Sequence, residues 1–179
     1  MGLVMKRATE TDILASVSAY WCHKRGSDFA PPRARINPIE IARYLPHVQF
    51  VTRESDGEFR YGLTGEAIVA GYGYNPSGKR FSDILQEPRL SIARRHYERV
   101  WVERRPTTSR NKYETPNGEQ KIATRIIMPL SEDGRHVTSV FVSQIFEYSS
   151  QFFAFRGIDW MIDDELDEFE YFQCAHGAS

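Results

Sequence analysis

Cysteine is scarce in this chain of 179 residues, which has only Cys22 and Cys174, far apart in the sequence. Two distant cysteines provide neither a disulfide framework nor the closely spaced pairs that bind metals, so the sequence predicts free thiols in a reducing compartment. Runs of about 18 apolar residues, which a membrane span needs, are also missing. The N-terminus lacks the apolar segment of a secretory signal. We therefore expect a cytoplasmic protein with no membrane partner.

A surplus of positive charge is missing as well. The 23 lysine and arginine residues stand against 24 acidic residues, and the formal net charge is -1. Proteins that bind nucleic acids concentrate positive charge to meet the phosphates, so we expect no nucleic-acid partner.

Acidic and aromatic residues gather near the C-terminus, where residues 147–179 contain one arginine and eight acidic residues. Apolar residues recur there at helical spacing, namely Ile158, Ile162, Leu166, Phe169 and Phe172. This pattern predicts a partly helical extension over residues 148–179. Its apolar face would pack either against its own domain or against a partner.

Helical periodicity also marks residues 1–26. Ile13, Val17 and Trp21 stand four residues apart and would form one stripe of a helix from about Thr9 to Arg25. Gly26 is a natural end for this helix. The stripe must be buried on the domain or on a second copy, so these three residues are the candidates for a dimer contact.

Residues 27–147 alternate between strand and helix patterns. Strand patterns cover residues 47–53, 59–64, 107–115, 120–130 and 136–146, while helical patterns cover 39–44, 67–69 and a long stretch from 87 to 105. Asp-Gly or Asn-Gly pairs separate neighbouring strands, as expected for hairpins. These features predict an α+β domain whose helices pack on one face of an antiparallel sheet.

Catalytic motifs are weak. Residues 73–80, GYNPSGKR, approach a phosphate-binding loop, but Arg80 stands where Ser or Thr would bind magnesium. Glu66 and Asp83 could serve as the base of a small isomerase or hydrolase, yet their positions fit an early helical charge and a helix cap better. We therefore expect no enzyme and no metal site, and keep the isomerase or hydrolase as an alternative.

Motifs of tryptophan, proline and glycine recur at unusual positions over residues 20–146. They are Tyr20-Trp21, Arg25-Gly26, Pro31 to Arg35, Asn37 to Glu40, Leu45 to His47, Phe59 to Tyr61, Leu63 to Gly65 and Gly78 to Arg80. Together they resemble a bacterial family of single-domain PAS-like proteins. The resemblance implies a five-stranded antiparallel PAS sheet with helices cupping one face, and a sensory or regulatory role.

A small ligand would then lie between the sheet and the helices. The candidate residues for that cavity are Tyr61, Leu63, Ile68, Tyr72, Phe81, Ile126 and Phe141. Photosensory flavin members of the superfamily carry a reactive cysteine in a characteristic motif, and residues 75–77 contain none, so we expect no flavin. His96 is the candidate for an axial haem ligand, but its predicted place at the border of the apolar stripe argues against haem. No cofactor is required by the sequence.

The resemblance and the absence of any kinase, cyclase or DNA-binding segment favour a non-catalytic sensory module that acts through another signalling protein as a homodimer. The alternative from a different class is a ligand-free interaction scaffold that dimerises through its N-terminal helix.

Overall fold

The computed structural model describes residues 10–115, 117–148 and 168–171. The N-terminal part contains the helix α1 (Glu10–Arg25) and the short 3-10 helices η1 (Arg33–Arg35) and η2 (Ala42–His47). The rest of the domain contains β1 (Val48–Arg53), β2 (Phe59–Thr64), α2 (Glu66–Tyr72), α3 (Phe81–Ile84), α4 (Arg89–Glu103), β3 (Thr107–Glu114), β4 (Gln120–Leu130) and β5 (Ser139–Tyr148). A short strand, β6 (Glu168–Tyr171), follows.

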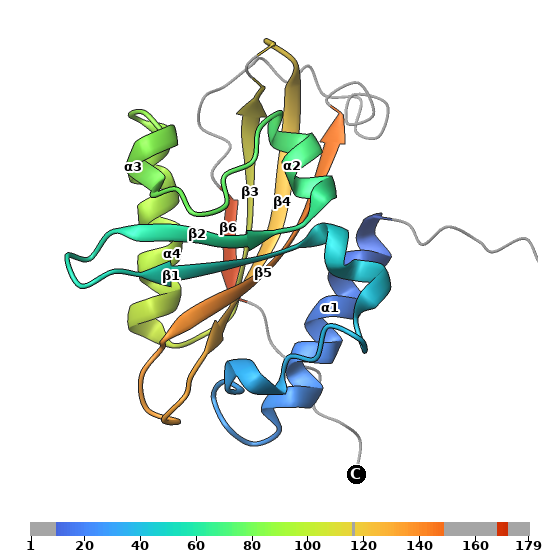
Figure 1. Ribbon diagram of the computed structural model, residues 1–179, viewed down its shortest axis with the longest axis vertical. Helices are drawn as coiled ribbons and strands as arrows, with labels where there is room; N and C mark the ends of the chain where they lie inside the picture. Colours follow the sequence, from blue (N-terminus) through green and yellow to red (C-terminus); the bar gives the residue numbers. More distant parts are fainter. Residues whose placement is uncertain (1–9, 116, 149–167, 172–179) are drawn as a thin grey trace, which may run out of the picture.

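All strands belong to one antiparallel sheet with the order β2-β1-β5-β4-β3-β6. β5 lies between β1 and β4, so the last strand of the domain pairs with the first. Figure 1 shows α1 and α4 on opposite sides of this sheet. We call the face under α4 the inner face and the face under α1 the outer face.

The outer face is the base of one hydrophobic core. Val17 and Trp21 of α1 are fully buried there, against Met128 of β4 and Phe141 of β5. The indole Nε1 of Trp21 also donates a hydrogen bond to the Pro129 carbonyl at 2.9 Å. α1 is therefore fixed on the domain by both packing and a buried hydrogen bond.

The inner face carries the second core. Val51, Val140 and Val142 of the sheet meet Tyr97 and Val100 of α4. The α-helices of the PAS-like domain pack on one face, as predicted, and the N-terminal helix α1, predicted as a separate element, covers the other face. Periodicity indicates that a helix has an apolar stripe, but not which face of the sheet receives it.

The burial of α1 also corrects the dimer hypothesis. Ile13 retains 8% of its exposure, while Val17 and Trp21 retain 0%. Since the apolar stripe of α1 is buried against the sheet of the same chain, these three residues are not available for contact with a second copy.

The C-terminal extension departs from its predicted helix at residues 168–171. There the chain is the extended strand β6, which pairs with β3 from Thr107↔Tyr171 to Arg110↔Glu168. The edge of β3 offers backbone groups that a strand can satisfy and a helix cannot. Ile158, Ile162, Leu166 and Phe172 lie outside the described residues.

Two further expectations concern Cys22 and the membrane. Cys22 is disulfide-bonded, so the expectation of a free thiol is wrong for this residue. Cys174 lies outside the described residues. None of the helices in the described ranges has the length and hydropathy that crossing a membrane requires.

Removing the Trp21 side chain tests the outer core. We expect Trp21→Ala to lower the free energy of unfolding by about 3–5 kcal/mol, because it leaves a large cavity and an unpaired carbonyl. Urea unfolding measures the change. Val102→Ala is the control, since Val102 is 68% exposed on α4, and should stay within about 0.5 kcal/mol of wild type. Equal losses in the two variants would contradict the assigned packing of α1.

Candidate functional site

A row of polar side chains crosses the inner face. Gln144 of β5 pairs directly with Arg125 of β4, and Arg125 pairs directly with Ser109 of β3. Directly opposed side chains on one face have Cβ atoms about 5 Å apart. Their exposed fractions are 0%, 7% and 1%, respectively. We call Gln144, Arg125 and Ser109 the polar row.

The polar row is only partly hydrogen-bonded. The Tyr72 hydroxyl of α2 donates to Gln144 Oε1 at 3.0 Å, and Arg125 Nη2 donates to Asn111 Oδ1 at 2.9 Å. Arg125 Nε, Gln144 Nε2 and Ser109 Oγ are buried and have no hydrogen-bond partner among the described residues. Each unmet group costs about 1–3 kcal/mol, so water or a ligand is expected to complete the row.

A second line of inner-face residues contributes two more polar groups. Gln49 Nε2 donates to Thr64 Oγ1 at 2.9 Å, which leaves the buried Gln49 Oε1 without a partner in the described structure. Thr107 Oγ1, at the other end of this line, is also buried without a hydrogen-bond partner in the described structure. Hydrogen-bonding capacity is therefore spread across the inner face.

Four aromatic side chains from β2, α3 and α4 form part of the inner core: Phe59, Tyr61, Phe81 and Tyr97. We call them the aromatic wall. The ring centroids of Tyr61 and Phe81 lie 4.4 Å apart, and those of Phe81 and Tyr97 lie 5.0 Å apart. Burial raises the pKa of the Tyr61 and Tyr97 hydroxyls, and the charge of Arg125 opposes this rise at both. Ile127 of β4, which lies two residues from Arg125 on the same face, joins the wall to the row.

Glycines allow α2 to lie directly on the sheet. A Cβ atom at Gly71 would stand 2.0 Å from Cδ2 of Phe146 on β5, and one at Gly65 would stand 2.2 Å from the Leu45 carbonyl oxygen. Only glycine permits such close approaches. They bring the Tyr72 hydroxyl onto Gln144, so the position of α2 is coupled to the polar row.

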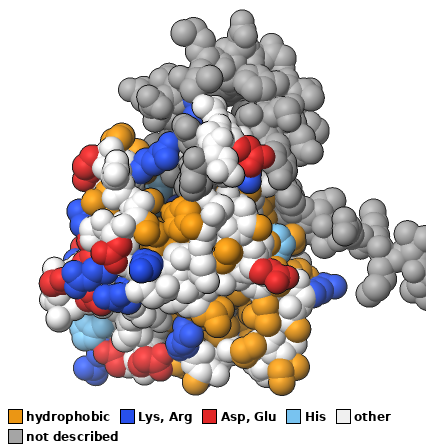
Figure 2. Space-filling view, turned by 45° about the horizontal axis from the view of Figure 1, so that its top comes forward, with side chains coloured by type: hydrophobic (Ala, Val, Ile, Leu, Met, Phe, Trp, Pro, Cys, Tyr) orange, Lys and Arg blue, Asp and Glu red, His pale blue; other side chains and the backbone are white. Residues whose placement is uncertain are grey.

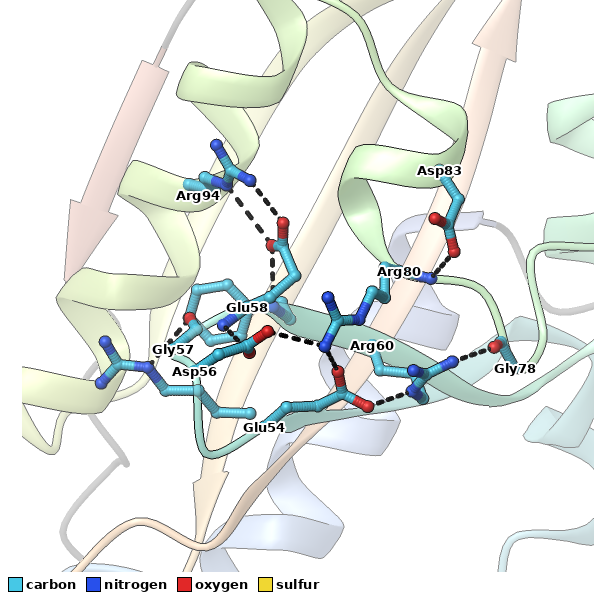
Figure 3. Close-up of polar contacts among 11 residues, drawn as sticks. Glu54, Asp56, Gly57, Glu58, Arg60, Gly78, Arg80, Asp83 and Arg94 are labelled. Atoms are coloured by element: carbon cyan, nitrogen blue, oxygen red, sulfur yellow. Dashed lines mark hydrogen bonds and ion pairs between the residues drawn. The ribbon is translucent and has the colours of Figure 1, made fainter.

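Ion pairs connect the β1–β2 hairpin to the two helices beside this site, α3 and α4. Figure 3 shows Arg80, just before α3, between Glu54 and Asp56 of the β1–β2 hairpin, while Arg94 of α4 reaches Glu58. Asp83 accepts a hydrogen bond from the Arg80 backbone N at 2.8 Å and so caps α3. The network fixes the two helices that carry Phe81 and Tyr97.

The same network predicts acid sensitivity. Arg60 lowers the pKa of Glu54, with Arg80 adding to the effect, and the Glu58 backbone N lowers that of Asp56. A carboxyl group whose pKa is lower in the folded than in the unfolded protein stabilises the fold at any pH above its unfolded-state pKa. This stabilisation is lost as the pH falls through the pKa of the folded state.

We therefore expect Arg80→Gln to reduce the loss of unfolding free energy between about pH 7 and about pH 3, the range in which carboxyl groups titrate. Urea unfolding at both pH values measures it. Arg43→Gln is the control, because Arg43 contacts the Tyr44 hydroxyl and no carboxylate in the described ranges. An unchanged acid dependence in Arg80→Gln would contradict the role of this network.

Four of the predicted cavity residues come together on the inner side. Tyr61 and Phe81 belong to the aromatic wall, and Ile68 and Tyr72 are buried residues of α2. Ile126 and Phe141 were assigned to the wrong face, because both belong to the outer core with α1. Alternation along a strand separates two sets of residues without saying which set faces inward.

Leu63 was also wrongly placed. It is 60% exposed, although Phe59 and Tyr61 on the same strand are buried. The register explains this, since Gln49 pairs with Thr64 but Val51 pairs with Tyr61, so β2 has an extra residue at this point. The bulge breaks the alternation and turns Leu63 outward.

Leu63 instead lines a surface groove of about 530 Å³. Its other lining residues include Ile36, Leu45 and Phe50, and the Arg33 guanidinium lies 3.6 Å from the centre of the Phe50 ring. Figure 2 shows acidic and basic side chains intermingled on the side of the β1–β2 hairpin, with hydrophobic side chains gathered on the opposite side.

His96 lies on the buried face of α4 with an exposed fraction of 1%. Its predicted place at the border of the stripe is therefore wrong, and that argument against a haem ligand does not hold. No group of three potential metal ligands occurs among the residues that the structure describes.

The carboxylates considered for an isomerase do not reach the inner site. Glu66 and Asp83 are both exposed, and Asp83 serves as a helix cap. The members of the polar row were missed, although they could have been noticed as polar residues inside two otherwise apolar strands.

A family model described as a PAS domain matches residues 9–143. The chain belongs to the PAS domain family. Its sheet order and the helices over the inner face are those of a PAS domain, as the sequence resemblance implied. No curated protein matches the chain.

Several solved structures are similar at low identity. One is a light-oxygen-voltage domain studied with a flavin analogue, with 16% identity and a TM-score of 0.48 over 68% of this chain and 93% of that one. The PAS domain of Bordetella pertussis BvgS has 17% identity and a TM-score of 0.44 over 66% and 94%. The Rhodobacter sphaeroides LOV protein has 11% identity and a TM-score of 0.46 over 62% and 68%. Such similarity concerns the fold alone.

Light-oxygen-voltage domains are among these structures, and the expectation against flavin stays a prediction. Within the described residues, the one cysteine is Cys22, which packs on the outer core and is disulfide-bonded. It is separated from the inner face of the PAS sheet by the sheet itself, so it cannot form an adduct with a group bound there.

Proposed function

We propose that this PAS domain is a non-catalytic sensory module that binds a small ligand against the inner face of its sheet. The observation that carries the proposal is the polar row, in which Arg125 Nε, Gln144 Nε2 and Ser109 Oγ are buried without a partner among the described residues. A ligand that supplies these partners would gain hydrogen bonds that the protein has already desolvated.

The signal would leave the site through α2. Tyr72 joins this helix to Gln144, and Gly71 holds it in contact with β5. A ligand that competes for Gln144 changes the balance between positions of α2, which is a population shift. The start of α2 also borders the surface groove that Leu63 lines, because Gly65 and Glu66 belong to the lining of that groove. A movement of α2 would therefore change the shape of a surface where a partner protein can bind.

The alternative of a scaffold that dimerises through the N-terminal helix has lost its proposed surface, because Val17 and Trp21 are buried. A homodimer would have to use another part of the molecule. An isomerase or hydrolase has lost its proposed bases, because Glu66 and Asp83 are exposed.

Two serines provide a matched test of the ligand site. Ser109 lies on the inner face and Ser143 on the outer face, and each has a buried Oγ without a hydrogen-bond partner in the described ranges. Native mass spectrometry of freshly purified protein would show a bound small molecule. We expect Ser109→Ala to weaken its binding about 2- to 10-fold through the lost hydrogen bond, and Ser143→Ala to leave it unchanged.

Equal occupancy in wild type and both variants would place the ligand elsewhere. If no molecule co-purifies and no metabolite extract raises the melting temperature, the sensory proposal fails.

A further inference from the structure

We infer that the ligand of the inner face is a small organic carboxylate, bound by the Arg125 guanidinium with its apolar part against the aromatic wall. This inference rests on the proposed function and adds the chemical class of the ligand and the residue that recognises it.

The first argument is charge. Arg125 has an exposed fraction of only 7%. It forms no ion pair with a carboxylate in the described part of the chain. Its one hydrogen-bond acceptor there is the neutral amide of Asn111. A buried charge without a counter-charge costs several kcal/mol, so a site of this kind favours an anion.

The second argument is the kind of hydrogen-bonding capacity left open. In the polar row the unpaired atoms are Arg125 Nε, Gln144 Nε2 and the Ser109 hydroxyl. The Gln144 oxygen already accepts from Tyr72, so the open atoms are two N–H donors and one hydroxyl, which can also donate. A carboxylate supplies acceptors only, and its two oxygens match the parallel donors of a guanidinium.

The surroundings limit what the rest of the ligand can be. Ile127 lies two residues from Arg125 on the same face of β4 and belongs to one apolar cluster with the four residues of the aromatic wall, so the wall continues the surface next to Arg125. Two other basic side chains are buried on the inner side in the described ranges, Lys121 of β4 and His96 of α4. Lys121 is paired with Glu119 at 2.9 Å, so Arg125 is the one permanently charged side chain there without a carboxylate partner among the described residues. A compact monocarboxylate with an apolar or aromatic body therefore fits better than a polyanion.

The test compares acids with their neutral amides. Acetate, benzoate and phenylacetate are titrated into the full-length protein, and acetamide, benzamide and phenylacetamide serve as matched neutral probes. The readout is the NMR signal of the Arg125 Nε–H group, assigned by its absence from Arg125→Met. We expect at least one acid to shift this signal and its amide to bind about 10- to 100-fold more weakly, because the charge-assisted bond is lost.

Variants separate recognition from folding. Since the Arg125 variants lack the Nε–H signal, acid binding to them is measured by isothermal titration calorimetry. Arg125→Met should abolish this binding, while the melting temperature of the ligand-free protein stays equal or rises because an uncompensated buried charge is gone. Arg110→Met is the control. Arg110 lies on the outer face of β3, where it pairs with Glu147 at 3.4 Å, and its loss should leave acid binding unchanged. Arg125→Lys, which keeps the charge, should retain weaker binding.

Three outcomes overturn the inference. They are equal responses to acids and amides, acid binding that survives in Arg125→Met, and an Nε–H signal that no probe moves because water alone completes the row. In each case, a co-purified molecule that is lost in Ser109→Ala would still support the sensory proposal, so the two failures can be told apart.

Discussion

Pairing of β5 with both β1 and β4 is the constraint on which the rest of this structure depends. It joins the hairpin near the start of the domain to the strands at its end, and so closes one continuous sheet. Because successive side chains of β5 point to opposite faces, the same strand supplies Phe141 to the outer core and Gln144 to the inner site. Both cores therefore share one backbone.

The two faces have different roles for a physical reason. The outer face is filled mainly by apolar side chains and by Trp21, whose indole N–H is hydrogen-bonded, and the buried hydroxyl groups of Ser143 and Thr124 on this face belong to small, uncharged side chains. The inner face instead holds Arg125 and the amide of Gln144 among apolar neighbours, which costs stability unless something else completes their hydrogen bonds. A protein that retained such groups only for folding would be better served by apolar residues, and this is why we connect them with binding.

Coupling between site and surface follows from close contacts rather than from flexible segments. Gly71 lets α2 touch β5, Tyr72 crosses to Gln144, and Gly65 seats the start of α2 on the preceding turn. The ion pairs of Arg80 and Arg94 hold the opposite side of the site to the β1–β2 hairpin. One wall is thus anchored by ion pairs, while the other is held by neutral contacts, namely packing at Gly71 and the hydrogen bond of Tyr72 to Gln144, and we expect α2 to respond first.

The sequence by itself determined the order of helices and strands, the hairpin turns, the family and the aromatic residues of β2 and α3, because these depend on local periodicity and on glycine and proline chemistry. Tertiary structure decided the faces: α1 covers the outer side, the bulge in β2 turns Leu63 outward, and Ile126 and Phe141 point away from the site. It also brought Gln144, Arg125 and Ser109 together from three strands. Strand register is set by pairing between distant segments, which no local pattern contains.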